Sequence, residues 1–375
     1  MRDVFIVGAG IDAYRPASDR AYADIGLPAI RMALTDAGVA WGGVESTFVS
    51  TALLGVAVGR PMLRHLGINA APIVHVENAS ASGSSAIGLA RDKIAAGLAD
   101  VVLVVGVDKP AMLPTGQELV GDGAWPGPAA PPIILFALMA ERLSREYGWT
   151  REDLARVAAK NHANASLNPA AQSKRPVSQA DILAAPPIAG MLTKFECCPV
   201  GEGGAAVVLA SSDAIARLGL DRDRAVRIAA SVSVTEVHNG GDELAEIEIT
   251  RQATDEVLDR AGLHIDDIDL VELHDAFSIE ELAYLDAMGI SAPGRVAKDA
   301  RAGHFDIGGR CAVSASGGLI GMGHPVGPTG IGQVVEMVRQ MRGEAGSRQH
   351  TRTRAGLVHM VGLGAVCVMH VLTRT

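Results

Sequence analysis

The sequence predicts an α/β fold in which mainly parallel sheets are covered by helices. Short runs rich in β-branched residues alternate with amphipathic helical segments through most of the chain. The chain has 375 residues, of which 48% are hydrophobic, enough for one large domain or two medium ones. Its 43 glycines and 3% aromatic residues indicate many tight turns and a core of small aliphatic side chains. This composition is more typical of an α/β enzyme than of an all-β binding module.

The first half of the chain shows a regular succession of expected elements. We expect strands at 4–7, 47–51, 73–76 and 101–107, and helices at 27–38 and 84–97. Pro28 suits the first turn of its helix, and Gly38 suits the C-terminal cap of the same helix. The run at 101–107 is apolar apart from one glycine, as buried central strands are.

The second half repeats part of this pattern. A loop, a glycine-rich helix start, a helix and an apolar strand occur at 76–107 and again at 317–364, where the helix is expected at 330–341 and the strand at 355–361. Such self-similarity indicates an internal duplication. We expect the chain to divide into halves at residues 1–225 and 226–375.

The region at about 115–200 interrupts the first half. It holds a proline-rich stretch, Trp125–Pro132, and expected helices around 136–147 and 151–164. Its apolar content is too high for a disordered linker. We therefore expect an insertion that covers the active site.

Charge and cysteine content exclude several classes of protein. The net charge is −9 and no basic run is present, which argues against nucleic-acid binding. No apolar run reaches the roughly 20 residues that span a bilayer, and the N-terminus enters a strand directly, so we expect a cytoplasmic protein. The four cysteines (Cys197, Cys198, Cys311 and Cys367) form no metal-binding spacing, and we expect no metal. The adjacent Cys197 and Cys198 are expected to be reduced, buried thiols.

The segment Gly8-Ala9-Gly10 loosely matches a dinucleotide-binding fingerprint. That site also needs a helix to begin at the glycines, so that its N-terminus holds the pyrophosphate. Pro16 follows closely and disfavours helix at the residue before it. The sequence therefore favours a plain turn after a strand over a nucleotide site.

Ser80 precedes the helix expected at 84–97. A side chain at a helix N-terminus meets free N–H groups and the positive end of the helix dipole, which lower the pKa of a thiol and stabilise an oxyanion. Serine is also among the best helix-capping residues, and the local pattern alone favours capping.

Two histidines occupy glycine-rich or strand-end turns. His274 follows the strand expected at 270–273, and His324 follows the glycine-rich run Gly317–Gly323. A histidine at such a position is better placed to present its imidazole to a ligand than to fill a core. Together with Ser80, these histidines indicate a catalytic site.

These motifs resemble the thiolase superfamily, in particular its sterol-carrier-protein-2-type thiolases and lipid-transfer-protein-like relatives. The resemblance runs through most of the chain. Its segments are Val4–Gly10, the loop around Ser80, Lys160–His162 with Asn168–Pro169, Cys197–Pro199 with Gly203–Ala206, His274–Phe277, Ser316–Gly318, Gly323–Pro325 and Gly362–Gly364.

The resemblance implies a fold of two similar βαβαβαββ halves in a five-layer α-β-α-β-α arrangement, usually as a homodimer. It implies a role in lipid metabolism, an acyl-CoA substrate and no further cofactor. The expected reaction makes or breaks the carbon–carbon bond beside the thioester carbonyl. By this resemblance Ser80 stands at the nucleophile position, and His274 and His324 supply the oxyanion hole and the base. Three glycines are expected beside the acyl oxygen: Gly318, Gly362 and Gly364.

The chain departs from the family pattern where thiols are expected. Ser80 stands where the family has its nucleophilic cysteine, and Ala276 stands where this subtype has a second one. Ordinary thiolases carry that cysteine before the last glycine run, where this chain has Val358-His359-Met360; Cys367 lies beyond the glycines. A serine needs a base to attack, and its ester does not return easily to a thioester. A reversible thiolase cycle is therefore disfavoured.

Three functions remain open at this point. The first is an acyl-CoA C-acyltransferase that uses Ser80 or dispenses with covalent catalysis. The second is a CoA-thioester retro-aldolase (a lyase) of lipid or steroid side-chain breakdown, working with a small partner that has an OB fold and a zinc ribbon. The third is a non-catalytic acyl-CoA-binding subunit, against which the presence of both histidines argues.

Overall fold

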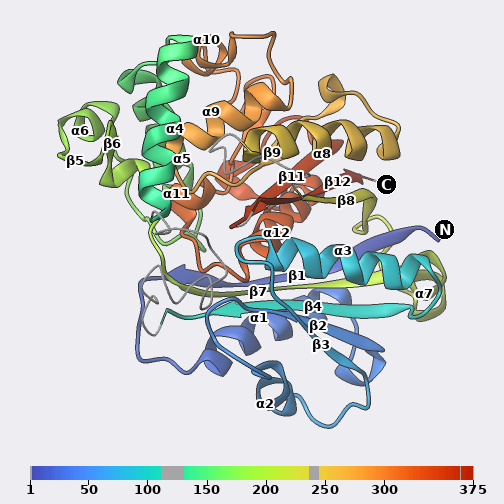
Figure 1. Ribbon diagram of the computed structural model, residues 1–375. Coiled ribbons are helices and arrows are strands. Elements are labelled where there is room, and N and C mark those ends of the chain that lie inside the picture. The colour runs from blue at the N-terminus through green and yellow to red at the C-terminus, as the bar shows by residue number, and fades with distance from the viewer. Residues whose placement is uncertain (1, 111–130, 236–244, 364, 375) are drawn as a thin grey trace.

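Ten strands of the described chain form one continuous hydrogen-bonded ladder in the order β10-β9-β11-β12-β8-β1-β7-β4-β2-β3 (Figure 1). The computed structural model describes residues 2–110, 131–235, 245–363 and 365–374. The strands of the ladder are β1 (Val4–Arg15), β2 (Ser46–Ser50), β3 (Ile73–Val76), β4 (Val101–Asp108), β7 (Glu202–Ser211), β8 (Val226–Thr235), β9 (Leu270–Glu272), β10 (Ala312–Val313), β11 (Ala355–Gly362) and β12 (Val366–Arg374). A separate small sheet pairs β5 (Pro187–Ala189) with β6 (Leu192–Thr193).

The two halves of the ladder have the same topology. In each half the strands lie in the order third, second, fourth, fifth, first: β3-β2-β4-β7-β1 and β10-β9-β11-β12-β8. In each, the second strand pairs in parallel with the third and fourth, and the fifth pairs antiparallel with its neighbours. This shared topology confirms the predicted internal duplication. Among the described strands, β1 and β8 connect the halves of the ladder through two residue pairs, Phe5 with Arg227 and Ile6 with Val226.

Helices cover and separate these two halves, which confirms the predicted α/β fold. The expectation of mainly parallel sheets is wrong, because four neighbouring strand pairs of the ladder are parallel and five are antiparallel. The α-helices are α1 (Tyr22–Ala37), α2 (Gly59–Arg64), α3 (Ser82–Ala95), α4 (Pro132–Tyr147), α5 (Arg151–Ser166), α6 (Gln179–Ala184), α7 (Ser212–Leu218), α8 (Ala245–Ala261), α9 (Ser278–Ala287), α10 (Val296–Arg301), α11 (Gly318–Met322) and α12 (Thr329–Arg342). Short 3-10 helices occur at Trp41–Gly43, Lys194–Glu196, Ile265–Asp267 and Gly346–Arg348.

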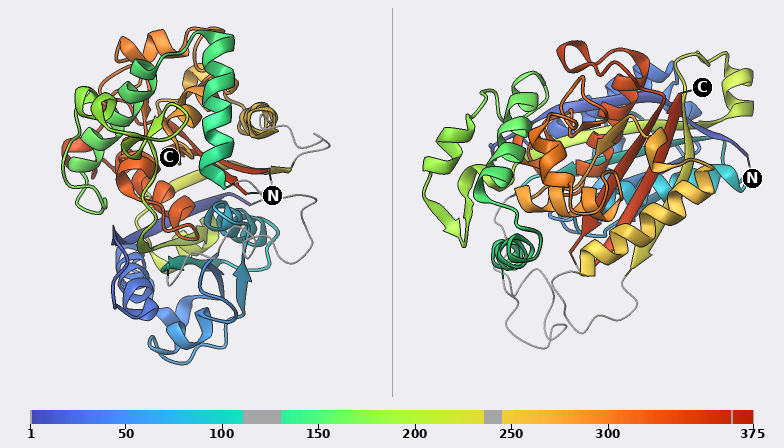
Figure 2. Two further views of the ribbon diagram at one scale, coloured as in Figure 1. Left: turned by 60° about the vertical axis from the view of Figure 1, so that its left-hand side comes forward. Right: turned by 90° about the horizontal axis from the view of Figure 1, so that it is seen from above.

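The layers alternate between helix and sheet. The helices α3 and α12 pack together between the two halves of the ladder, while α1 covers the outer face of the first half and α8 that of the second (Figures 1 and 2). Within the described ranges, no helix combines the length and hydrophobicity needed to cross a bilayer.

The predicted end of the first strand at Gly8 is wrong, because β1 continues to Arg15. Its glycines lie beneath α1, where a Cβ on Gly8 would collide with the carbonyl oxygen of Ala33 and one on Gly10 with that of Ala29. The two glycines therefore allow close helix-on-strand packing. They form neither a turn nor the start of a nucleotide-binding helix.

Helix α1 begins at Tyr22, earlier than the predicted residue 27, so Pro28 lies inside the helix. Pro28 has no N–H to donate to the carbonyl of Asp24, one turn earlier. The guanidinium of Arg20 donates to that carbonyl at 2.5 Å and satisfies it. Gly38 caps the helix in the left-handed conformation, with φ of 66°, as predicted.

The insertion between β4 and β7 is folded over the second half. Its helix α4 packs on α9, and α5 packs on α11 (Figure 2). Most of the proline-rich stretch expected at Trp125–Pro132 lies outside the described residues. The described part of the insertion is therefore ordered structure, not a linker, as predicted.

The N-terminal ends of α3 and α12 approach each other closely at two glycines. A Cβ on Gly83 would lie 2.8 Å from the carbonyl oxygen of Gly327, and one on Gly330 would collide with Ser84 Oγ. A Cβ on Gly106 of β4 would lie 2.5 Å from Cα of Pro328. The loops that precede these two helices therefore approach as closely as backbone allows.

We predict that Gly330→Ala destabilises the protein by about 1–3 kcal/mol, because the added methyl group overpacks this contact. Ser84 Oγ is buried without a hydrogen-bond partner among the described residues, so Ser84→Ala added to the first change should recover part of the loss. Gly42→Ala is the control, since a Cβ there meets nothing within 4 Å. Urea denaturation measures the free energy of unfolding of all these variants. A Gly330→Ala protein as stable as Gly42→Ala would contradict the prediction.

Candidate active site

A cavity of about 490 Å³ opens where loops of both halves meet the insertion, and Ser80, His274 and His324 all line it. These side chains come from the loop after β3, the loop after β9 and the turn before α12. Most of the other lining residues are apolar, among them Ile133 and Phe136 of α4. The insertion therefore contributes a wall of the site, as predicted.

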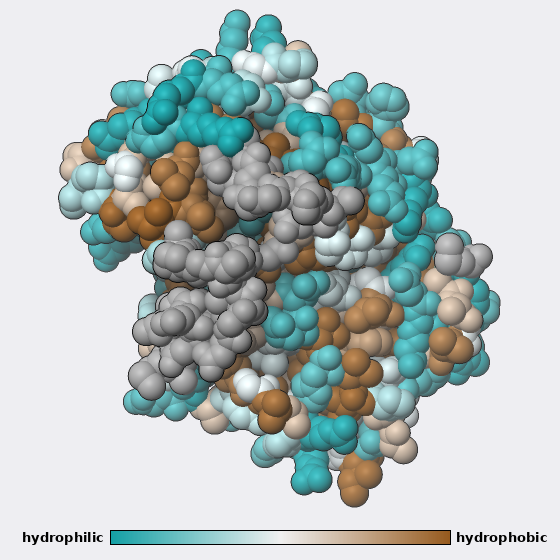
Figure 3. Space-filling view, viewed as in Figure 1, coloured by the Kyte–Doolittle hydropathy of each residue, from teal (hydrophilic) through white to brown (hydrophobic). Residues whose placement is uncertain are grey.

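Apolar side chains also reach the surface beside this cavity. Ile134, Leu135 and Leu138 of α4 are exposed. Figure 3 shows brown residues gathered on the left of the molecule over this part of the insertion. The apolar wall of the cavity thus continues outward along α4.

Ser80 is presented by a strained turn. The preceding Ala79 has φ of 48°, in the left-handed region that residues with a Cβ seldom adopt. Ser80 Oγ lies 2.9 Å from Nε2 of His324. The capping role that the local pattern favours is wrong, because the N-cap of α3 is Ala81 and no side chain caps it. Ser82 Oγ instead stabilises the turn, accepting from Asn78 N at 2.8 Å and donating to Ala79 O at 2.6 Å.

His324 is a buried, neutral imidazole held at both nitrogens. Its Nδ1 lies 2.9 Å from Thr329 Oγ1 in the first turn of α12, and its Nε2 faces Ser80. Burial, and then the charge on His274, lower the pKa of His324 to about 3. The hydroxyl of Ser80 can therefore donate to an unprotonated Nε2. Ser80, His324 and Thr329 have the order of nucleophile, base and orienting group.

His274 has the opposite electrostatic setting. Burial acts to lower its pKa, but the charge and hydrogen bond of Glu280, with the charge of Glu246, outweigh burial and raise it. Its Nδ1 lies 2.8 Å from Glu280 Oε1. Its Nε2 is buried with no hydrogen-bond partner in the described part of the chain. The two imidazoles meet edge to face, with ring centroids 5.6 Å apart, so a proton donor stands beside a neutral base.

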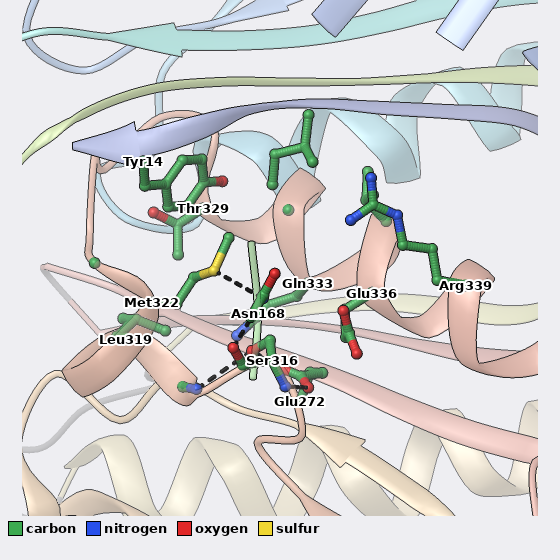
Figure 4. A pocket seen from close by; sticks show the side chains of 15 residues that line it. Tyr14, Asn168, Glu272, Ser316, Leu319, Met322, Thr329, Gln333, Glu336 and Arg339 are labelled. Carbon is green, nitrogen blue, oxygen red and sulfur yellow. Dashed lines mark hydrogen bonds between the residues drawn. The ribbon is translucent and has the colours of Figure 1, made fainter. Parts of the chain in front are cut away.

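A second, enclosed cavity lies behind the His324 turn (Figure 4). Its volume of about 20 Å³ holds roughly one water molecule and no substrate. Glu272 lines it and accepts from N and Oγ of Ser316 at 2.9 and 2.6 Å, while burial, and then the charge of Glu336, raise its pKa to about 8. Tyr14 Oη, on the other side, donates to Pro328 O at 3.1 Å. This polar cluster supports the turn that carries His324.

Two of the three predicted glycines, Gly318 and Gly362, line different cavities. Gly362 ends β11 and lines the main cavity. Gly318 lines the small cavity instead, and its N–H donates to Ser316 Oγ at 3.3 Å, so the geometry does not direct it at an acyl oxygen. Gly364 lies outside the described residues.

Sequence reasoning missed several residues of the site. Cys197 and Cys198 are free but only partly buried, and both line the main cavity, where simple buried thiols were expected. Burial raises the pKa of Cys197 to about 12 and that of Cys198 well above its usual value, so both are protonated thiols. Cys367 is fully buried in β12. Among the described residues, no group of three or more histidine, cysteine or acidic side chains is arranged to hold a metal ion.

Comparisons with known proteins agree on one family. The family model "Thiolase, N-terminal domain" matches residues 4–213, and "Thiolase C-terminal domain-like" matches residues 230–374. The chain is 32% identical to sterol carrier protein 2 of Bos taurus, over 98% of this chain and 71% of that protein. It is 33% identical to the acetyl-CoA acetyltransferase of Methanothermobacter thermautotrophicus, over the whole of both chains. Among solved structures, the Ltp2-ChsH2(DUF35) aldolase has a TM-score of 0.87 at 24% identity, covering 99% of this chain and 98% of that one.

We predict that the neutral state of His324 makes stability fall at mildly acidic pH. The unfolded chain protonates this histidine near pH 6.5, whereas the folded protein does so only near 3, so acid favours unfolding as pH drops below about 6.5. Between pH 6.5 and 5, the free energy of unfolding of the wild type should fall more steeply than that of His324→Asn, by up to about 1.4 kcal/mol per pH unit. Equal slopes would contradict the prediction. His65→Asn, at an exposed position, is the control and should keep the wild-type slope.

Proposed function

Because this chain belongs to the thiolase family, we propose that it is an enzyme of lipid metabolism that acts on acyl-CoA thioesters in the manner of an acyl-CoA C-acyltransferase. The observation that carries this proposal is the convergence of Ser80, His274 and His324 on one largely apolar cavity. A hydrophobic cavity suits an acyl chain, and the three polar groups suit the thioester that ends it.

His274 is the group that stabilises negative charge on the thioester oxygen. Its unpartnered, buried Nε2 is aimed at no other polar atom of the described protein, and Glu280 favours its protonated form. A protonated imidazole in a dry cavity donates a strong hydrogen bond to an oxygen that gains charge in the transition state. The role of oxyanion donor follows from this geometry.

Ser80 and His324 supply a nucleophile and its base. The Ser80 hydroxyl attacks the carbonyl carbon while its proton passes to Nε2 of His324, 2.9 Å away. The C–S bond then breaks, and the CoA thiolate leaves with that proton, so that an acyl-serine ester remains. The base is weak, because its orienting partner Thr329 is neutral and the nearby charge of His274 opposes its protonation. Acylation is therefore slow, and transfer to an acceptor runs in one direction.

The weakness of this base favours a second candidate, a CoA-thioester retro-aldolase. In that reaction a base takes the β-hydroxyl proton of a β-hydroxyacyl-CoA and Cβ becomes a carbonyl carbon as the Cα–Cβ bond breaks. The electron pair of that bond moves to the thioester oxygen, where His274 holds the enolate, and Ser80 only donates a hydrogen bond. The shared fold with the Ltp2-ChsH2(DUF35) aldolase supports this candidate. It implies a small partner protein of the OB-fold and zinc-ribbon type, next to the homodimer that the family resemblance implies.

Intact-protein mass spectrometry after incubation with a panel of acyl-CoAs tests the acyltransferase. We expect the wild type to gain the mass of an acyl group with release of CoA, Ser80→Ala to gain none, and His324→Asn to react at least about tenfold more slowly. Ser347→Ala, an exposed serine far from the cavity, is the matched control and should react like the wild type. An adduct that persists in Ser80→Ala would exclude Ser80 as the nucleophile.

The lyase candidate makes a different prediction. A panel of β-hydroxyacyl-CoAs should be cleaved to a shorter acyl-CoA and an aldehyde or ketone, with the partner protein present. Cleavage should survive in Ser80→Ala, because Ser80 takes no covalent part, and be lost in His274→Asn, because the enolate oxygen loses its donor. Chromatography of the CoA products measures cleavage by both variants. Cleavage that required Ser80 would count against the non-covalent route.

A further inference from the structure

Glu246, in the first turn of α8, lines the same cavity as His274 and connects to it through hydrogen bonds. Its Oε2 lies 2.8 Å from the hydroxyl oxygen of Tyr284, which lies 3.0 Å from Oε1 of Glu280. That oxygen is in turn 2.8 Å from Nδ1 of His274. Both ends of this chain of four side chains therefore open on the cavity. The mechanism above uses only the His274 end.

The proton count along this chain allows two states of Glu246. Both oxygens of Glu280 already act as acceptors, Oε2 from the backbone N–H of Phe277 at 2.7 Å and Oε1 from Nδ1 of His274 at 2.8 Å. The Tyr284 hydroxyl has one proton for two carboxyl oxygens. When it donates to Glu280, the contact with Glu246 needs a protonated carboxyl group. When Glu246 is ionised, the hydroxyl turns its proton toward Glu246. Rotation of one hydroxyl thus accommodates both states.

We propose that Glu246 is a catalytic acid–base residue that exchanges a proton with Cα of the bound acyl-CoA, a step that rests on the proposed function. The Glu246 carboxylate takes a proton from Cα, and the electron pair of that C–H bond moves to the thioester oxygen, where His274 Nε2–H receives the charge. The reverse step protonates Cα of the enolate. An enolate intermediate of this kind serves carbon–carbon bond formation and retro-aldol cleavage alike.

The other titratable groups of the cavity are poorly suited to this step. Cys197 and Cys198 are thiols whose pKa burial raises far above neutrality. His324 is engaged by Ser80 and Thr329. Glu77 is exposed, and its carboxylate accepts the backbone N–H of Ala79 at 2.7 Å.

The surroundings of Glu246 bring its titration near neutrality. Burial, and then the charge of Glu280, raise its pKa to about 7, while the hydrogen bond from Tyr284 and the charge of His274 act in the opposite direction. Glu280 and Tyr284 face it from α9, His274 from the loop after β9, and Cys367 from β12. A group that titrates near the working pH both accepts and donates protons efficiently.

Exchange of the Cα hydrogens in D₂O tests this assignment without requiring acyl transfer. The acyl-CoA that the wild type binds most tightly in calorimetry is incubated with each variant, and its deuterium content is followed by mass spectrometry. We expect exchange in the wild type, with a rate that rises through about pH 7 as Glu246 ionises. Glu246→Gln should bind the same acyl-CoA but exchange it at least about tenfold more slowly.

Two further variants separate a catalytic role from a structural one. Glu248→Gln makes the same chemical change at an exposed position of α8 and should exchange like the wild type. Tyr284→Phe removes the hydrogen bond that lowers the pKa of Glu246, so the midpoint of its pH profile should move to higher pH. A structural role alone would not move that midpoint.

The outcomes distinguish this proposal from the function on which it rests. Wild-type exchange that continues unchanged in Glu246→Gln overturns the role of Glu246 and leaves the acyl-CoA function intact. Binding of acyl-CoA with no exchange in the wild type overturns it as well. If no acyl-CoA binds to the wild type, the proposed function fails, and the role of Glu246 fails with it.

Discussion

The close approach of two helix N-termini, α3 from the first half and α12 from the second, is the constraint on which the site depends. Ser80 and His324 lie on loops that enter these helices, 244 positions apart in the sequence, yet their side chains are 2.9 Å apart. The short distance between the two loops is helped by Gly83 and Gly330, where a Cβ would collide with the carbonyl oxygen of Gly327 and with Ser84. A duplicated fold brings two equivalent loops together, and small residues at their junction allow the two loops to share one cavity.

The electrostatic asymmetry of the two histidines follows from what lies behind each ring. Behind His274 lies Glu280, whose charge and hydrogen bond raise the pKa of the imidazole. Behind His324 stands a neutral hydroxyl, that of Thr329, so burial prevails and the ring stays unprotonated. Each state reinforces the other, because a charge on His274 opposes a charge on His324. Two histidines with similar settings in the sequence thus differ in the structure: His274 is the acid and His324 is the base.

Local patterns in the sequence predicted most strands and helices and the duplication, and the family resemblance added Ser80 to His274 and His324, which line one cavity. The sequence-based predictions failed where contacts between residues far apart in the chain determine the local structure. The glycines of β1 have the pattern of a turn, and only the packing of α1 explains them. Pro28 fits inside its helix because Arg20 satisfies the exposed carbonyl. Glu246 has the pattern of an ordinary acidic residue in the first turn of a helix, and its partner Tyr284 lies 38 positions away. Hydrogen bonding over that separation leaves no periodic signal.

The two candidate functions share a single chemical requirement, and the cavity meets it without thiols. Condensation beside a thioester and retro-aldol cleavage both pass through an enolate, which needs a donor at the oxygen and an acid–base group at Cα. His274 meets the first need, and the carboxyl group of Glu246 is the available group for the second. Because Tyr284 and Glu280 join these two residues, the charge on one is sensed by the other, and loss of a proton at Glu246 favours retention of the proton on His274. Under these proposals, the hydrogen-bonded chain from Glu246 to His274 provides the groups that enolate formation needs. The fate of the enolate then depends on what Ser80 and the second substrate contribute.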